Sequence, residues 1–177
     1  GYERLSLVGP MASGKTTLGR LLARQLGLQV VDSDHEIERR NGVSIATIFD
    51  IEGEDAFRDR EERAIDELMN RHGVLVATGG GVVLREANRV RLRQESLVLF
   101  LNPDLETQIK RTQTDRKRPL LQGKDKAAVL KEMRVARYPL YRQVSDIEIP
   151  VDNRPGKKMM DVILKRLNQK GLISDDG

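Results

Sequence analysis

The chain contains no cysteine and no tryptophan, and it has only three phenylalanines and three tyrosines among its 177 residues. The absence of cysteine excludes disulfides and thiolate metal sites, which fits a reducing compartment. No apolar run approaches the roughly 20 residues that a membrane span needs, and no basic start followed by an apolar segment indicates a secretory signal. We therefore expect a cytoplasmic protein with no membrane partner.

Charged residues make up 33% of the chain and hydrophobic residues 38%, a balance typical of one globular domain covering 1–177. Between residues 104 and 143 there are 11 Lys/Arg against five Asp/Glu, an excess of six. The remaining residues hold 31 − 11 = 20 basic and 27 − 5 = 22 acidic side chains. Such a concentrated positive charge suits nucleotide phosphates. Few aromatic rings are available to stack on bases, so no nucleic-acid partner is expected.

The most informative motif is Gly9-Pro10-Met11-Ala12-Ser13-Gly14-Lys15-Thr16, which fits G-x-x-x-x-G-K-[ST]. It lies between an apolar run at 5–8, read as a strand, and an amphipathic stretch at 17–26, read as a helix. Backbone N–H groups and the helix N-terminus would favour an anion there, Lys15 would add a positive charge, and Thr16 would offer a hydroxyl to Mg²⁺. The flanking strand and helix favour this phosphate site over the alternative of a plain glycine turn with a solvated lysine.

Apolar runs alternate with helical stretches along the chain. Strands are expected at 5–8, 29–31, 74–77, 97–101 and 147–151, and helices at about 15–26, 34–41, 44–50, 53–72, 85–94, 104–112, 125–143 and 156–169. In the longest of these helices, Phe57, Ala64, Ile65 and Leu68 form a stripe that would face a core. The alternation predicts an α/β fold with a parallel sheet covered on both faces, whose ligands bind beyond the carboxyl ends of the strands.

The stretch at 112–125 interrupts this alternation. It is polar and basic, and it combines Arg116-Lys117-Arg118 with Pro119-Leu120-Leu121. Its length and its mixture of charged and apolar residues favour a lid that closes over a ligand. The alternative is an ordinary solvated loop.

Two carboxylates, Asp32 and Asp34, follow the strand that ends at Val31. A spacing of two lets both side chains point the same way across the pleat. Beside a phosphate site they predict a division of roles, in which one holds Mg²⁺ and the other orients or deprotonates an acceptor hydroxyl. The alternative is that Ser33 or Asp34 caps the following helix, with Glu36 placed for a first-turn contact. The two interpretations are compatible.

Three consecutive glycines, Gly79, Gly80 and Gly81, follow the strand at 74–77. A backbone without side chains can approach a small ligand closely, so a triplet at the carboxyl end of an inner strand predicts a substrate wall. The alternative is a loop with no binding role.

Two arginines are candidates for binding an anionic acceptor. Arg58 and Arg137 would grip a carboxylate in bidentate fashion if their guanidinium groups converged on one pocket. The alternative for each is a surface ion pair, and Arg58 has three acidic residues within helical reach, namely Glu54, Glu61 and Glu62. The residues themselves indicate a P-loop kinase of a small anionic molecule without identifying that molecule.

Several motifs occur in a defined order: Gly9-Pro10-Met11 with Gly14-Lys15-Thr16-Thr17, Asp32-Ser33-Asp34 with Ile37-Glu38, Ile48-Phe49 with Gly53-Glu54, Phe57-Arg58 with Glu61, Gly79-Gly80-Gly81, Arg118-Pro119-Leu120-Leu121, and Arg137-Tyr138-Pro139-Leu140-Tyr141. Together they resemble the shikimate kinase family, and the resemblance runs from about Arg4 to Gly171. The P-loop is shared with many nucleotide-binding proteins, whereas the other motifs are much more specific.

The resemblance implies transfer of the γ-phosphoryl group of ATP to the 3-hydroxyl of shikimate, giving shikimate 3-phosphate and ADP in chorismate and aromatic amino-acid biosynthesis. It implies a three-layer P-loop fold similar to nucleoside monophosphate kinases. The sheet would have five parallel strands in order 2-3-1-4-5, flanked by helices, with a mobile lid at about 112–125 and a substrate-binding helical region at about 33–61. ATP, shikimate and Mg²⁺ would be the ligands, and we expect a monomer.

The resemblance also assigns roles to particular residues. Asp34 would contact the acceptor hydroxyls as the candidate base, Lys15 would bridge phosphates, and Arg118 would stabilise charge on the transferring phosphoryl group. Arg58 and Arg137 would hold the shikimate carboxylate, and Thr16 and Asp32 would serve Mg²⁺. The ring would be lined by Gly79, Gly80 and Gly81. Nucleotide contacts are implied for Gly9, Ala12, Ser13, Gly14, Lys15, Thr16, Thr17, Arg111, Arg118 and Arg154, with Arg111 and Arg154 beside the adenine.

The chain departs from the family pattern at Ala12, where the family usually has glycine. Alanine is tolerated unless the position requires a positive φ, in which case nucleotide affinity would be reduced. The competing hypotheses are a gluconate- or nucleotide-phosphorylating kinase on the same scaffold, a nucleotide-binding regulator without catalysis, and a basic RNA-binding domain. Asp34 and Arg118, as a base and a lid arginine, argue against a regulator.

Overall fold

The computed structural model describes residues 3–113 and 125–172. Within these ranges the strands form a single parallel sheet in the order β2-β3-β1-β4-β5, which confirms the predicted topology. The strands are β1 (Arg4–Val8), β2 (Gln29–Asp32), β3 (Val74–Ala77), β4 (Leu97–Pro103) and β5 (Ile147–Val151). Their carboxyl ends share one edge, as the parallel pairing requires.

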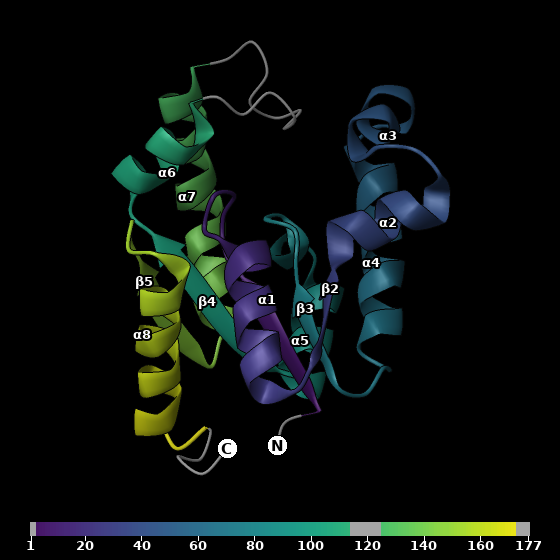
Figure 1. Ribbon diagram of the computed structural model, residues 1–177. Coiled ribbons are helices and arrows are strands. Elements are labelled where there is room, and N and C mark those ends of the chain that lie inside the picture. The colour runs from purple at the N-terminus through teal and green to yellow at the C-terminus, as the bar shows by residue number, and fades with distance from the viewer. Residues whose placement is uncertain (1–2, 114–124, 173–177) are drawn as a thin grey trace.

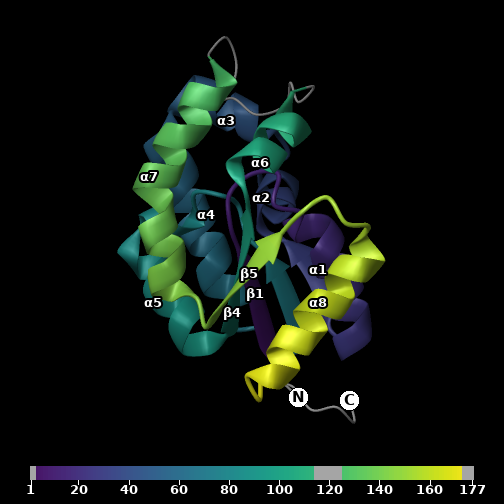
Figure 2. The same ribbon diagram turned by 90° about the vertical axis from the view of Figure 1, so that its left-hand side faces the viewer.

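Helices cover both faces of the sheet and give the predicted three layers (Figures 1 and 2). One face carries α1 (Lys15–Leu26) and α8 (Gly156–Gln169), and the other carries α4 (Glu54–Leu68), α5 (Glu86–Glu95) and α7 (Lys126–Val144). The remaining elements are α2 (Ser33–Asn41), α3 (Ile45–Glu52), the short 3₁₀ helix η1 (Val82–Leu84) and α6 (Leu105–Thr112).

Apolar side chains on β1, β3 and β4 are buried on both faces, as a parallel sheet between helical layers demands. Leu5 and Leu7 of β1 pack with the α1–α8 layer, whereas Val8 and Phe100 pack with the opposite layer. The stripe predicted on the long helix is also buried, but it serves two clusters. Ile65 and Leu68 pack beneath the sheet, while Phe57 and Ala64 pack with Ile37 of α2 and Ile48 of α3.

Some predicted boundaries were wrong. The helix expected at 53–72 ends at Leu68, and η1 directly after the glycine triplet was not predicted. Strand β4 continues past Leu101 to Pro103, because Asn102 and Pro103 stay in register with Pro150 and Val151 of β5.

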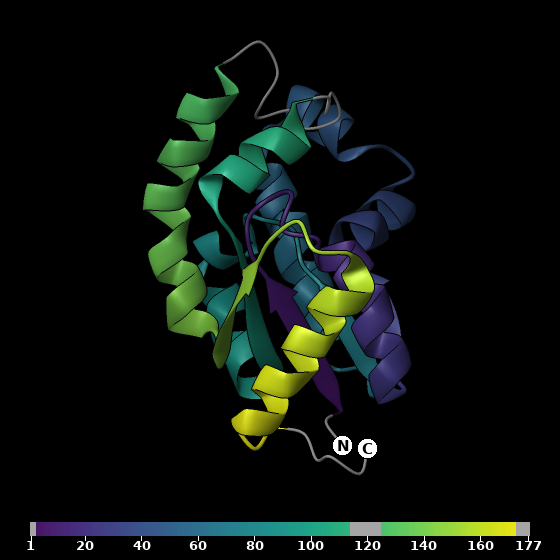
Figure 3. The ribbon, with the colours of Figure 1, turned by 60° about the vertical axis from the view of Figure 1, so that its left-hand side comes forward.

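Two helical groups rise beyond the carboxyl ends of the strands (Figures 1 and 3). One consists of α2, α3 and the start of α4, and the other of α6 and the adjoining part of α7. The loop between β1 and α1 lies between these groups (Figure 1). Most of the predicted lid, residues 114–124, lies outside the described residues.

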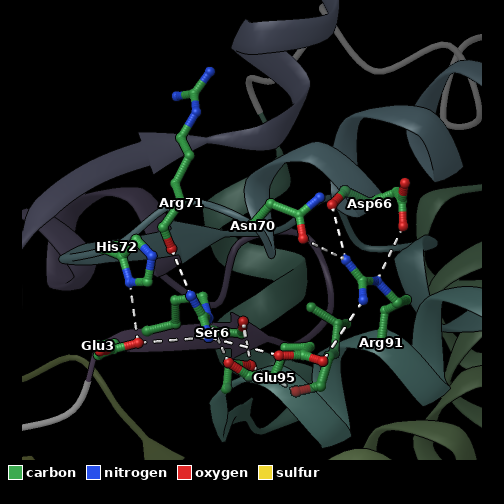
Figure 4. Close-up of polar contacts among 11 residues, drawn as sticks. Glu3, Ser6, Asp66, Asn70, Arg71, His72, Arg91 and Glu95 are labelled. Carbon is green, nitrogen blue, oxygen red and sulfur yellow. Dashed lines mark hydrogen bonds and ion pairs between the residues drawn. The ribbon is translucent and has the colours of Figure 1, made fainter.

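A polar cluster ties the elements together at the opposite end of the sheet (Figure 4). Arg4 donates from Nε to the Glu95 carbonyl at 2.7 Å and from Nη1 to the Arg71 carbonyl at 2.8 Å, which joins β1 to the segments before β3 and β4. In the same cluster His72 Nδ1 lies 3.1 Å from Glu3 Oε2. None of the helices that the structure describes is both long and apolar enough to traverse a bilayer.

Candidate active site

A cavity of about 520 Å³ opens where the P-loop meets the carboxyl ends of the strands. One wall is formed by residues 11–18, and another by Asp34 with Thr78, Gly79 and Gly80. The phosphate loop, the carboxylates and part of the glycine triplet therefore face one space, as the sequence predicts for this edge of the sheet.

Carbonyl groups at the start of the P-loop accept hydrogen bonds from the lysine of the same loop. The ammonium group of Lys15 donates to the carbonyls of Gly9 at 2.6 Å and Pro10 at 2.8 Å. Gly14 is left-handed at φ 86°, and α1 begins at the next residue. The N-terminus of a helix is suited to an anion.

Ala12 has a φ of 63°, so the departure from glycine falls at a position with a left-handed backbone. Among the described residues, Ala12 is the only non-glycine residue with a positive φ. The sequence analysis predicts reduced nucleotide affinity if residue 12 requires a positive φ, and the structure shows that it has one. An L-residue pays about 1–2 kcal/mol to adopt this conformation.

Asp32 and Asp34 do not share one face of a strand, and that prediction was wrong. Strand β2 ends at Asp32, and Asp34 lies in the first turn of α2. Asp32 itself is the cap of α2, since its Oδ1 accepts hydrogen bonds from the amides of Asp34 and His35 at 3.0 and 3.1 Å. Ser33 and Asp34 are therefore not the capping residues. The hydroxyl of Ser33 instead accepts a hydrogen bond from the Gly79 amide at 3.2 Å.

The second carboxylate oxygen of Asp32 accepts a hydrogen bond from the Thr16 hydroxyl at 2.9 Å. Both residues line the cavity. One hydroxyl and one carboxylate beside a phosphate loop are a donor set that fits Mg²⁺, because this ion usually keeps several waters and takes its other ligands from phosphates. No cluster of three or more His, Cys, Asp or Glu suited to a metal occurs among the described residues, so a site here would depend on such outside ligands.

The glycine triplet is in close contact with three of the predicted acceptor-binding side chains. A Cβ on Gly79 would lie 2.6 Å from Asp34 Oδ1, and one on Gly81 would overlap the guanidinium group of Arg58. A Cβ on Gly80 would lie 3.5 Å from Arg137 Nη1. The structure therefore brings Asp34, Arg58 and Arg137 together around one short backbone segment from α2, α4 and α7.

Arg58 does form ion pairs of the kind that the alternative interpretation anticipated, but the arginine itself is buried, and of its two partners Glu61 is buried while Glu54 is half exposed. Its Nη1 lies 2.9 Å from Glu61 Oε1 and its Nη2 lies 3.3 Å from Glu54 Oε1. Arg58 is 6% exposed, Arg137 8% and Glu61 0%. A surface role is therefore excluded for both arginines.

Burial raises the pKa of Glu61 to about 7, because an ionised carboxylate loses its hydration there. The positive charges of Arg58 and Arg137 oppose this shift, and the negative charge of Asp34 adds to it. Asp34, which is half-buried, thus interacts electrostatically with the three buried groups. Burial likewise raises the pKa of Tyr141, whose hydroxyl donates to the Gly80 carbonyl and supports the glycine wall from α7.

Arg111 on α6 and Arg154 in the loop after β5 both line the cavity, whereas Arg58 and Arg137 are not among its lining residues. Arg111 donates to the carbonyls of Ala12 at 2.9 Å and Asp152 at 3.0 Å. Arg154 is paired with the Asp152 carboxylate at 2.8 Å and is half exposed. Both contact Asp152, Arg111 through its carbonyl and Arg154 through its carboxylate. Arg118 lies outside the described residues.

The sequence analysis assigned no role to several residues that build this site. Glu61 appeared only within a motif and as one possible partner of Arg58, although its spacing of three from Arg58 was a usable signal. Tyr141 also appeared only within a motif. Gln108 gave no signal at all, because its contact with the Met11 carbonyl at 3.1 Å joins residues 97 positions apart.

The chain is similar to known proteins along nearly its whole length. The family model described as shikimate kinase matches residues 11–168. The shikimate kinase of Actinobacillus succinogenes is 50% identical over 163 residues, covering 92% of this chain and 93% of the relative. That of Pseudomonas putida is 50% identical over 167 residues, covering 94% and 97%. The solved structure of shikimate kinase from Acinetobacter baumannii in complex with shikimate superposes with a TM-score of 0.93 at 40% identity, covering 97% of this chain and 96% of the other.

Proposed function

Since this chain belongs to the shikimate kinase family, we propose how its residues divide the work of that reaction. The chain catalyses ATP-dependent phosphorylation of the 3-hydroxyl of shikimate, giving shikimate 3-phosphate and ADP for chorismate and aromatic amino-acid biosynthesis. The family membership decides between this activity and that of a gluconate- or nucleotide-phosphorylating kinase.

The observation that carries the assignment of the acceptor site is the convergence of Asp34, Arg58 and Arg137 on the glycine triplet. Two buried guanidinium groups would bind the carboxylate of shikimate, because charge-assisted hydrogen bonds are strongest where water is excluded. Gly79, Gly80 and Gly81 would line the ring. Glu61 would hold Arg58 in position through their 2.9 Å contact.

The donor side would be formed by the P-loop. Backbone amides of the P-loop, apart from Pro10 which has none, and the N-terminus of α1 would receive the phosphates of ATP, with Gly9, Ala12, Ser13, Gly14 and Thr17 among the contacts. Lys15 would exchange its loop carbonyl partners for phosphate oxygens. Arg111 and Arg154 would lie beside the adenine, because both line the same cavity as the P-loop and both contact Asp152.

We assign the Mg²⁺ site to Thr16 and Asp32, whose side chains are already in contact. A bound Mg²⁺ would neutralise phosphate charge during transfer. Asp34, which faces Gly79 and the cavity, would orient the acceptor hydroxyl and accept its proton. Arg118 would complete the neutralisation of charge on the phosphoryl group, and enclosure of the site would keep water from competing as acceptor.

Phosphoryl transfer depends on positioning and electrostatic stabilisation more than on covalent chemistry. The proposed site would supply both, since Asp34 for the acceptor hydroxyl, Lys15 for the phosphates, and Thr16 with Asp32 for the metal all line one cavity. We propose that the active form is a monomer. We also propose that it acts in the cytoplasm.

Turnover measured as coupled ADP release with shikimate, gluconate and nucleoside monophosphates, compared side by side, tests the proposed function. We expect turnover with shikimate alone. Equal turnover with all three acceptors, or with none of them, would refute the assignment of this acceptor site.

A further inference from the structure

Four consecutive carbonyl groups of the P-loop, those of residues 9–12, accept hydrogen bonds from side chains. Lys15 occupies the first two, as described above. The third and fourth accept from α6: Gln108 Nε2 donates to the Met11 carbonyl at 3.1 Å, and Arg111 Nη1 donates to the Ala12 carbonyl at 2.9 Å. Because a peptide unit is planar, holding the Met11 and Ala12 carbonyls toward α6 turns the amides of Ala12 and Ser13 in the opposite direction.

The two carbonyls held from α6 flank the left-handed residue of the loop. Ala12, at φ 63°, is joined to Met11 by the peptide that Gln108 holds. An alanine leaves the left-handed region readily unless its neighbours prevent it, whereas glycine populates that region without penalty. The hydrogen bonds from Gln108 and Arg111 fix the carbonyls before and after the Ala12 Cα, and so restrain Ala12 in this conformation.

The Met11 segment is anchored to the same part of the fold by packing. The side chain of Met11 is 8% exposed and packs with Leu105 and Ile109 of α6 and with Leu130 of α7. Gln108 is 1% exposed, so its amide donates in a site without competing water. The hydrogen bond is therefore a fixed feature of the interface between α6 and the loop.

We propose that Gln108 is a positioning residue for nucleotide binding, which holds the Met11–Ala12 peptide so that Ala12 keeps its left-handed conformation. This inference rests on the proposed function of the P-loop as the phosphate site. Gln108 acts through the loop backbone and does not line the cavity. Arg111 contributes to the same restraint, but its place in the cavity would confound its effect on the nucleotide, so Gln108 is the cleaner test.

The proposal predicts that Gln108 matters because residue 12 is alanine. Loss of one buried hydrogen bond to a carbonyl corresponds to about a fivefold loss of affinity when the loop must be reordered to bind. In an Ala12→Gly background the loop can reach the same conformation unaided. Loss of the Gln108 hydrogen bond should then lower ADP affinity by less than about twofold.

The experiment is a double-mutant cycle on ADP affinity, measured by isothermal titration calorimetry. The four proteins are the parent, Gln108→Met, Ala12→Gly and the double variant. Methionine retains the volume of glutamine without its donor, and Gln108→Asn, too short to reach the carbonyl, is the second variant if methionine impairs folding. Thr107→Val, which changes a neighbouring buried polar residue of α6 whose backbone amide donates to the Asp104 cap at 2.7 Å, is the matched control and should leave ADP affinity unchanged.

We expect about fivefold weaker ADP binding for Gln108→Met, little loss in the double variant, and unchanged shikimate affinity throughout. Equal losses in the parent and Ala12→Gly backgrounds would overturn the proposal, as would no loss in either. A Lys15→Met variant distinguishes failure of the Gln108 proposal from failure of the assignment of the P-loop as the phosphate site. If that variant binds ADP as tightly as the parent, the P-loop assignment itself has failed.

Discussion

The buried carboxyl of Glu61 makes the stability of the fold depend on pH in a defined direction. Its pKa is about 7 in the folded protein, against about 4.5 for an unperturbed glutamate. The folded state therefore binds this proton more tightly than the unfolded state does. Below pH 4.5 the group has no effect on stability. As the pH rises from 4.5 through 7, ionisation is easier in the unfolded chain, so the free energy of unfolding falls.

The expected magnitude follows from the two pKa values. A difference of about 2.5 units corresponds to about 3.4 kcal/mol when the group is ionised in both states. Between pH 5 and pH 8 the linkage relation gives a decrease of about 2.5 kcal/mol. Glu61→Gln removes this titration while keeping the size of the side chain and one acceptor for Arg58.

Urea unfolding of the parent and of Glu61→Gln at pH 5 and pH 8 measures this contribution. From pH 5 to pH 8 the free energy of unfolding of the glutamine variant, minus that of the parent, should increase by about 2.5 kcal/mol. Glu62→Gln removes an exposed carboxylate of the same helix that pairs with Arg85 at 3.0 Å, and it should leave the pH dependence of the parent in place. A stability difference between parent and Glu61→Gln that is the same at both pH values would refute the reasoning.

Three further predictions concern separate parts of the molecule. Asp34→Asn should lower kcat by at least about 100-fold while ATP binding persists, because the amide cannot accept the hydroxyl proton; loss of ATP binding in calorimetry would mean that Asp34 serves the metal. Gly81→Ala should raise the shikimate KM about tenfold or more with little change in the ATP KM, since its Cβ would displace the Arg58 guanidinium, whereas Gly80→Ala, whose nearest contact is 3.5 Å, should cost much less. Equal effects of the two alanines would contradict this. Arg4→Met should lower the free energy of unfolding by about 2 kcal/mol, because two partly buried carbonyls lose a charged donor. The kinetic constants should not change, because Arg4 lies at the opposite end of the sheet from the site. A fall in kcat with an unchanged free energy of unfolding in urea would contradict this prediction.

Much of the fold could be predicted because the strands are short apolar runs with clear boundaries. Val74–Ala77 and Ile147–Val151 were placed at their observed ends. Errors arose where a boundary is set by tertiary pairing. Strand β4 extends to Pro103 only because β5 runs beside it, and the cap of α2 falls on Asp32 because the strand and the helix meet there without a connecting residue.

The site could be predicted in its parts but not in its electrostatics. Motif spacing located the P-loop, the carboxylates and the glycines, since each follows a strand. It could not show that Arg58 and Glu61 are buried, because this depends on α2 and α3 packing over α4 through Ile37 and Ile48. Nor could it show that Ala12 is left-handed, since a backbone angle at that position depends on the bonds that α6 makes to the loop.

The account depends most on Arg137 binding the carboxylate of the acceptor, and a cycle that removes either partner tests this directly. Dissociation constants of shikimate and its methyl ester would be measured for the parent and for Arg137→Ala. We predict that Arg137→Ala alone and esterification alone each weaken binding. The two changes together should weaken binding no more than either does alone, which gives a coupling energy of about 2 kcal/mol. Losses that simply add would contradict the account, because Arg137 would then not bind the carboxylate.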